Sequence, residues 1–148
     1  MRHPNADLIH TVDELLLSGD FPGFLAMHTE DAVMHVPGRG PLAGDHYGRE
    51  GIAAVFQREL SMVDGPPQLE QVDQLGSDTH AVSIVIQRIR RGGRDYAGRQ
   101  TVVARVEGGR LAEVWFLPQD QAAFDAFFTE AAPPVVSEPA AAAVRYRD

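Results

Sequence analysis

The stretch EDAVMHVPGRGPLAGDHYGREG, residues 30–51, decides how the rest of the chain is interpreted. It begins with a short strand pattern over residues 32–36, which a Pro-Gly pair ends abruptly. A glycine-rich loop continues as far as Gly48, and a helix pattern begins at Arg49. Two helical segments come before the stretch, and four strand-like runs and a short helix come after that third helix. This order predicts a sheet that curves around a pocket, with the quoted stretch at one edge of the mouth.

Apolar residues at helical spacing predict the helices around this stretch. Residues 5–17 are expected to form the first helix, and Asp20 is placed to cap a short second one. The third helix is expected over residues 49–63, and its apolar stripe includes one carboxylate, Glu59. Asp120 is placed to cap a final, phenylalanine-rich helix.

The second half of the chain has the pattern of an antiparallel meander. Strand-like runs fill residues 68–117, and glycine pairs at 92–93 and 108–109 are hairpin signals. We therefore predict an α+β fold, in which a cone-shaped, curved antiparallel sheet is wrapped by the N-terminal helices around an apolar central pocket. The domain is expected to cover residues 1–130, and the Ala- and Pro-rich residues 131–148 are expected to form a mobile tail.

The composition limits the possible chemistry. The chain has 148 residues and a formal net charge of -8, which argues against a nucleic-acid partner or an anionic membrane surface. It contains neither cysteine nor lysine, which excludes disulfides, cysteine nucleophiles and lysine Schiff bases. The six histidines lack metal-ligand spacing, and no nucleotide-binding loop is present, so no metal or cofactor is expected. Without a long apolar run or a signal peptide, a cytoplasmic protein is expected.

Two motifs resemble the SnoaL-like branch of the nuclear transport factor 2-like superfamily, which includes polyketide cyclases and ketosteroid isomerases. One is the loop Pro-Gly-x-Gly-Pro-Leu-Ala-Gly at residues 37–44, and the other is RVEGGRLAEVWFLPQDQAAFDAFF at residues 105–128. The resemblance covers about residues 5–129. It implies a cone-shaped domain, usually a homodimer through the outer face of the sheet, that performs acid–base chemistry on small molecules without a cofactor.

The resemblance also locates the functional groups of related isomerases, and here each of those positions is apolar. Their base falls at Val36, their oxyanion tyrosine at Val12 and their protonated aspartate at Val102. The aspartate that the polyketide cyclases keep on the last strand falls near Phe116. Double-bond isomerisation by the known mechanism of the family is therefore not supported.

Other ionisable residues are the candidates for catalysis. Arg88 lies in a strand row that the family alignment places inside the cone, where a cation could stabilise an enolate. His35 neighbours the isomerase-base position but faces the other way by alternation, so it would need a twist or bulge to act. His46 and Tyr47 lie on the glycine-rich loop, where a lid residue could meet a ligand. Structural roles also fit: an exposed arginine, an interface histidine and ordinary loop residues.

The predicted site thus has His35, His46 and Arg88 as catalytic residues. The pocket is expected to be lined by Val12, Met34, Val36, Tyr47, Phe56, Ile84, Ile86, Val102, Val114 and Phe116. The favoured function is a cofactor-independent isomerase or cyclase that acts by acid–base catalysis on an apolar carbonyl compound. The alternative is a non-catalytic protein that binds a small hydrophobic ligand.

Overall fold

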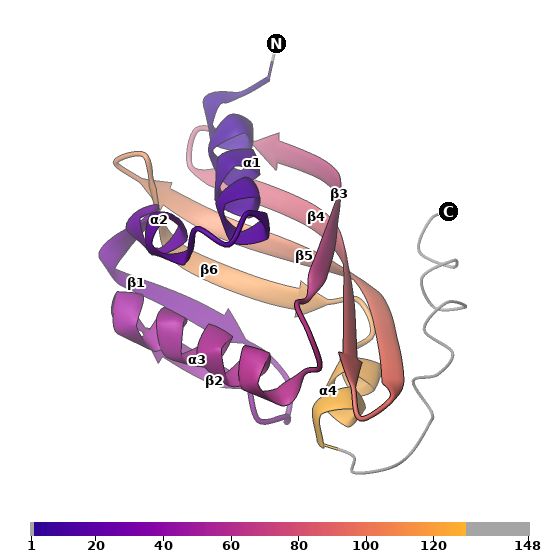
Figure 1. Cartoon of the computed structure of the whole chain (residues 1–148). Coiled ribbons are helices and arrows are strands. Elements are labelled where there is room, and N and C mark those ends of the chain that lie inside the picture. The colour runs from indigo at the N-terminus through magenta and orange to yellow at the C-terminus, as the bar shows by residue number, and fades with distance from the viewer. Residues whose placement is uncertain (1, 130–148) are drawn as a thin grey trace.

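The computed structural model describes residues 2–129, so the expected tail at residues 131–148 lies outside the described part. The helices are α1 (Pro4–Leu17), α2 (Phe21–Ala26), α3 (Gly48–Met62) and α4 (Gln121–Thr129). The strands are β1 (His28–Val36), β2 (Gly44–Tyr47), β3 (Gln68–Gly76), β4 (His80–Arg91), β5 (Arg94–Glu107) and β6 (Arg110–Pro118). They form one curved sheet in the order β2-β1-β6-β5-β4-β3 (Figure 1). The predicted α+β fold is confirmed.

Strands β3 to β6 form the predicted antiparallel meander. Both glycines of each hairpin turn have positive φ, 58° and 78° at residues 92–93 and 58° and 75° at residues 108–109. Such turns match the twist of the strands that they join, and glycine adopts them without steric cost. Strand β1 differs, because it pairs with β6 in parallel, with Met34 opposite Val114. This parallel ladder joins the N-terminal half of the chain to the meander.

The glycine-rich loop contains a strand that the sequence did not predict. Residues 44–47 pair antiparallel with β1, with Gly44 opposite Val36 and Tyr47 opposite Val33. The four residues Gly-Asp-His-Tyr carry no alternation of apolar and polar side chains, so pattern alone assigns them to the loop. They form a strand because the edge of β1 offers unpaired backbone groups.

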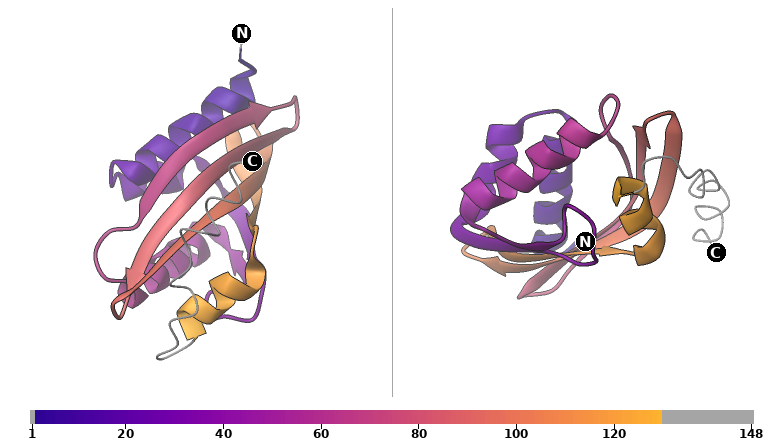
Figure 2. Two further views of the ribbon diagram at one scale, coloured as in Figure 1. Left: turned by 90° about the vertical axis from the view of Figure 1, so that its right-hand side faces the viewer. Right: turned by 90° about the horizontal axis from the view of Figure 1, so that it is seen from below.

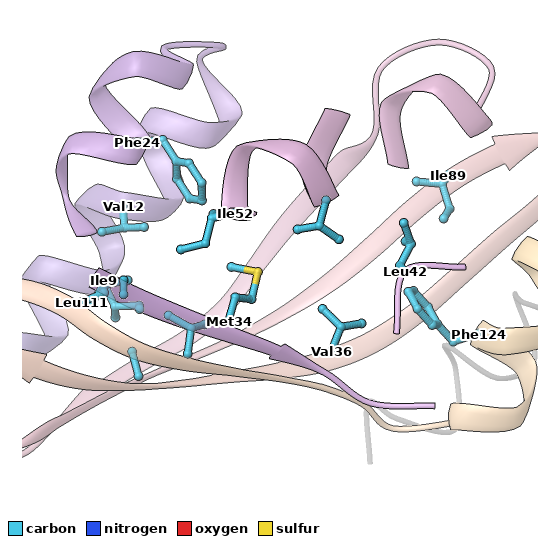
Figure 3. Close-up of a cluster of buried hydrophobic side chains, with 14 of the residues drawn as sticks. Ile9, Val12, Phe24, Met34, Val36, Leu42, Ile52, Ile89, Leu111 and Phe124 are labelled. Atoms are coloured by element: carbon cyan, nitrogen blue, oxygen red, sulfur yellow. The ribbon is translucent and has the colours of Figure 1, made fainter. Parts of the chain in front are cut away.

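The first three helices cover the concave face of the sheet, and α4 lies at one end of it (Figure 2). Side chains from the helices and from the inner strand rows form the core (Figure 3). Two predicted caps are present: Asp20 accepts the Gly23 N–H at 2.9 Å, and Asp120 accepts the Ala123 N–H at 3.0 Å. Within residues 2–129, no helix combines the length and apolar character needed to cross a bilayer.

The inner rows of β1 and β6 are as expected, but that of β4 is the opposite one. The side chains of β4 that face the helices are those of Ala81, Ser83, Val85, Gln87 and Ile89. The row of Ile84, Ile86 and Arg88 faces outward, so its predicted orientation was wrong. Both rows of this strand carry apolar residues, so alternation could not distinguish them. The row that faces the helices is the one whose polar side chains have partners there. Ser83 bonds to Asp13 of α1, and Gln87 bonds to Glu59 of α3.

Asp13 of α1 has a buried carboxyl group that points towards β4. The hydroxyl of Ser83, which is fully buried, donates a hydrogen bond to Asp13. Burial raises the pKa of Asp13 to about 6, although the hydrogen bond from Ser83 opposes that rise. The hydrogen bond between Asp13 and Ser83 therefore joins α1 to β4, although burial disfavours the ionised form of the Asp13 carboxyl group.

We expect Gly76→Ala to destabilise the fold, because α1 passes directly over this residue. A Cβ at position 76 would lie 2.5 Å from the Ala6 backbone nitrogen, so helix or strand must shift. Overpacking of this kind costs about 1–3 kcal/mol. Urea denaturation should show the loss. Gly40→Ala is the matched control, because its new Cβ would make only ordinary contacts, at 3.6 Å or more. Equal stability of the two variants would contradict the close approach of α1.

Candidate active site

An apolar cavity of about 30 Å³ lies between α3, α4 and the strands β1 and β6. It is lined by Met34, Val36, Leu42, Val55, Phe56, Glu59, Phe116 and Phe124. In Figure 3 the side chains of Met34, Val36, Leu42 and Phe124 occupy one interior region between the helices and the sheet. The volume is roughly the space of one or two water molecules. The space is partly open to solvent, and an organic ligand can be fully enclosed in it only if part of the wall moves.

Glu59 is the one ionisable residue in this lining, and it reaches the cavity from α3. The residue as a whole is half-buried, and its carboxyl group is turned towards the buried amide of Gln87. Burial raises the pKa of Glu59 to about 7, against the opposing effect of a hydrogen bond from Gln87. Near neutral pH this carboxyl group can therefore both accept and donate a proton.

The position of Glu59 follows from helix periodicity. Ile52, Val55, Phe56 and Glu59 lie at positions i, i+3, i+4 and i+7 of α3, which share one face of a helix. That face packs against the sheet, so the carboxyl group points inward with the apolar side chains.

Gln87, on the inner row of β4, orients the Glu59 carboxyl group. Its Nε2 donates a hydrogen bond to Glu59 Oε2 at 2.7 Å. Its Oε1 is buried and accepts no hydrogen bond from the described residues. An amide offers a donor to a carboxylate and, after a flip, an acceptor to a carboxylic acid. Gln87 can thus hold Glu59 in either protonation state.

One wall of the cavity belongs to residues 37–43, which we call the strap. Leu42 of the strap and Phe124 of α4 both line the cavity. Four hydrogen bonds with side chains outside the strap hold its backbone. Asp125 Oδ2 accepts from the Arg39 N–H at 3.1 Å, and Gln121 Nε2 donates to the Pro37 carbonyl at 3.3 Å. Arg58 Nη1 donates to the Pro41 carbonyl at 3.1 Å, and His46 Nε2 donates to the Leu42 carbonyl at 2.9 Å. The strap belongs to no helix or strand and is held by these four hydrogen bonds and by the buried Leu42, so we expect it to be the part of the wall that moves most easily.

The two predicted loop residues do not line this cavity. His46 is half-buried, and its ring binds the Leu42 carbonyl, which fixes the strap. Tyr47 is 68% exposed at the edge of the sheet. His46 therefore supports the wall, and Tyr47 faces solvent.

His35 lies on the outer face of the sheet, as alternation indicated, and no bulge turns it inward. Its Nδ1 lies 2.7 Å from Asp45 Oδ1, its Nε2 lies 2.6 Å from Glu113 Oε2, and its ring stacks on Trp115. The hydrogen bond with Asp45 and the bond with Glu113 raise the pKa of His35. Arg105 lies 3.6 Å from Glu113 in the same network. A homodimer through this face stays a prediction.

Arg88 also lies outside the cavity. It is exposed, and its Nη1 donates to Glu70 Oε1 at 2.9 Å on the neighbouring strand. Ile84 and Ile86 share its outward row and do not line the cavity. The structure therefore brings none of His35, His46 and Arg88 into the pocket.

The apolar part of the predicted pocket is partly present. Met34, Val36, Phe56 and Phe116 line the cavity, whereas Val12, Val102 and Val114 belong to the adjoining core. Residues that the sequence analysis did not assign to the pocket are Leu42, Val55, Glu59 and Phe124. The available signal was a carboxylate in the apolar stripe of a helix, since such a residue must find a partner inside. Among the described residues, no group of three or more His, Asp or Glu is arranged to hold a metal ion.

The fold and the pocket define a small α+β protein with one curved sheet, and comparison with known proteins identifies its family. A SnoaL-like domain model matches residues 9–114. The chain therefore belongs to the SnoaL-like family, as its two motifs indicated.

Three proteins illustrate what the chain is similar to. Rv0034 of Mycobacterium tuberculosis is 27% identical over 124 residues, which cover 82% of this chain and 94% of that protein. The structure of Bal32a, from a soil-derived mobile gene cassette, has a TM-score of 0.80 at 29% identity and covers 84% of this chain and 96% of that one. An NTF2-like protein of Burkholderia pseudomallei shares the fold, with a TM-score of 0.77 at 21% identity over 86% of this chain and 98% of that one.

We expect the stability of the protein to fall as the pH rises towards 7. The pKa of Glu59 is about 7 in the folded state, above its ordinary value of 4.5. Between these pH values the folded state binds more protons than the unfolded chain, so the unfolding free energy falls by about 3 kcal/mol at most. Glu59→Gln should remove this loss in urea denaturation measured at several pH values.

Asp13→Asn is the matched control for this measurement. The pKa of Asp13 is raised to about 6 from 3.8, so its contribution is lost at lower pH than that of Glu59. The Asp13 variant should flatten the curve mainly below pH 6 and leave the upper part intact. A curve for Glu59→Gln that coincides with wild type would show that the carboxyl group is not buried as described.

Proposed function

We propose that the protein is a cofactor-independent enzyme that moves a proton on a small apolar carbonyl compound, with Glu59 as the acid–base group. The observation that carries this proposal is the Glu59 carboxyl group at the wall of an apolar cavity, held by Gln87 at 2.7 Å. Its pKa of about 7 matches the condition for efficient general acid–base catalysis near neutral pH. Membership of the SnoaL-like family supports the class of molecule.

The reaction needs one group that takes a proton and returns it. As a carboxylate, Glu59 would remove a proton from the carbon next to the carbonyl, and the electron pair of that C–H bond would form an enolate. As a carboxylic acid, it would then donate the proton back, to the same carbon or to a conjugated one. Gln87 would donate to the carboxylate and, once its amide has flipped, accept from the acid.

The apolar lining suits a ligand with an aromatic or alicyclic ring. Phe56, Phe116 and Phe124 all line the cavity. A low dielectric strengthens the interaction of the carboxyl group with a polarised carbonyl.

The alternative function is non-catalytic binding of a small hydrophobic ligand. Two observations favour it. The cavity lining contains no second proton-transfer group beside Glu59. The position of the isomerase base, Val36, is apolar and lies in the same lining. Turnover, rather than binding, is what distinguishes the two functions.

We expect the wild-type protein to accelerate exchange of hydrogen for deuterium next to the carbonyl of α-tetralone, an apolar aromatic ketone. In D₂O, loss of the proton signal in NMR spectra reports the exchange. Glu59→Gln keeps the shape and the hydrogen-bonding capacity of the side chain but cannot take a proton. It should lower the rate by about 10²-fold or more.

Arg88→Ala is the control, because Arg88 is exposed on the outer face and should leave the rate unchanged. Loss of exchange in this variant, with exchange kept in Glu59→Gln, would contradict the proposal. Binding of α-tetralone to the wild type without any acceleration would favour the binding function instead.

We also expect that fixing the strap to α4 blocks access to the cavity. A Cβ at position 40 would lie 3.8 Å from Asp125 Cα, so the two Cα atoms are at most about 5.4 Å apart, within the Cα–Cα range of disulfides. Because the chain has no cysteine, the Gly40→Cys/Asp125→Cys variant contains one possible bond. Oxidation should lower α-tetralone binding and exchange by about tenfold or more, since access needs the strap to move.

A reductant should restore both quantities in the same sample, which makes each preparation its own control. The wild type under the same conditions should show no redox dependence. Unchanged binding in the oxidised variant would show that ligands reach the cavity by another route.

A further inference from the structure

The cavity lining contains one acidic residue, Glu59, and no basic residue. Burial raises the pKa of Glu59, and no cation among the described residues opposes that rise. Most buried carboxyl groups in proteins are paired with a cation or strongly hydrogen-bonded. Glu59 has one hydrogen bond, from the neutral amide of Gln87. The cavity therefore has an acid without a counter-ion.

Charged groups on the surrounding elements point elsewhere. On α3, Arg58 donates to the Pro41 carbonyl of the strap. On α4, Asp125 accepts from the Arg39 backbone and from Gln121. On β4, Arg88 lies on the outer face and pairs with Glu70. None of these groups lines the cavity, so Glu59 is the one ionisable group in its lining.

The rest of the lining also favours a cation. Phe56, Phe116 and Phe124 surround the space, and the faces of aromatic rings attract positive charge. Met34 adds a polarisable sulfur to the same lining. The chain as a whole carries a formal charge of -8, which draws cations towards the protein and repels anions.

We propose that this cavity also binds lipophilic ammonium ions, with the ammonium group paired to Glu59 and the hydrocarbon part against the three phenylalanine rings. An ammonium ion would supply the missing counter-ion and would hold Glu59 in its ionised form. An anionic ligand of the same shape would be excluded, because it would face an unpaired acid. The inference concerns the same cavity as the proposed function but does not depend on turnover.

The test compares three probes of nearly equal shape: 4-fluorobenzylamine, 4-fluorobenzyl alcohol and 4-fluorobenzoate. Fluorine NMR with the full-length protein reports the affinity of each. At pH about 8, where Glu59 is mostly ionised, the amine should bind about tenfold more tightly than the alcohol, and the benzoate most weakly. Glu59→Gln should abolish the preference for the amine while it keeps the alcohol's affinity.

A second measurement uses the wild type alone. The affinity for the amine should rise by about tenfold between pH 5.5 and 8, as Glu59 ionises, while that for the alcohol stays constant. Equal affinities for amine and alcohol, a preference that survives in Glu59→Gln, or no binding of any probe would each overturn the inference. Amine binding as expected, together with α-tetralone exchange that Glu59→Gln leaves intact, would overturn the proposed function and leave this inference standing.

Discussion

The parallel ladder between β1 and β6 is the contact on which the rest of the structure depends. Met34 lies opposite Val114 and His35 opposite Trp115, so one register sets both faces of the sheet at once. A shift by one residue would turn the inner side chains outward and carry the polar network of His35 into the core. The ladder also joins the strand pair β1–β2 to the meander, and the helices pack across both parts. The cavity lies where the two parts meet, since β1 and β6 both contribute to its lining.

Among the described residues, burial raises the pKa of two carboxyl groups, those of Asp13 and Glu59, and the surroundings of the two groups differ. Asp13 accepts a hydrogen bond from the fully buried Ser83 beneath α1, and it does not line the cavity. Glu59 has a comparable rise in pKa but lies at the wall of a cavity, beside Gln87. Burial alone shifts both pKa values, so a shifted pKa does not by itself identify a catalytic group. Access to a space that a ligand can occupy is the additional condition, and of the two only Glu59 meets it.

Much of the fold could be predicted from local patterns, because hairpin glycines, helix caps and the motifs at both ends of the domain act locally. The site could not, because it depends on which face of β4 meets the helices. Val82, Ile84 and Ile86 are at least as apolar as the residues of the inner row, so alternation could not identify the inner face, and the family alignment placed Arg88 in the pocket. The deciding contacts, Ser83 with Asp13 and Gln87 with Glu59, join residues 70 and 28 positions apart. Only the packed structure reveals such pairs.

The apolar Val36 at the end of β1 and the acidic Glu59 on α3 line the same cavity, and its small size relates the two. Related isomerases keep their base at that position, and here Val36 lines the same cavity as Glu59. The space between them is about 30 Å³, so an aspartate in place of Val36 would put two carboxyl groups around one or two water molecules. Each would raise the pKa of the other, and one would stay protonated at neutral pH. Under the proposed function, a single carboxyl group on α3, with an apolar residue at the end of β1, would leave one proton-transfer site in the cavity and place it on the helix instead of the sheet.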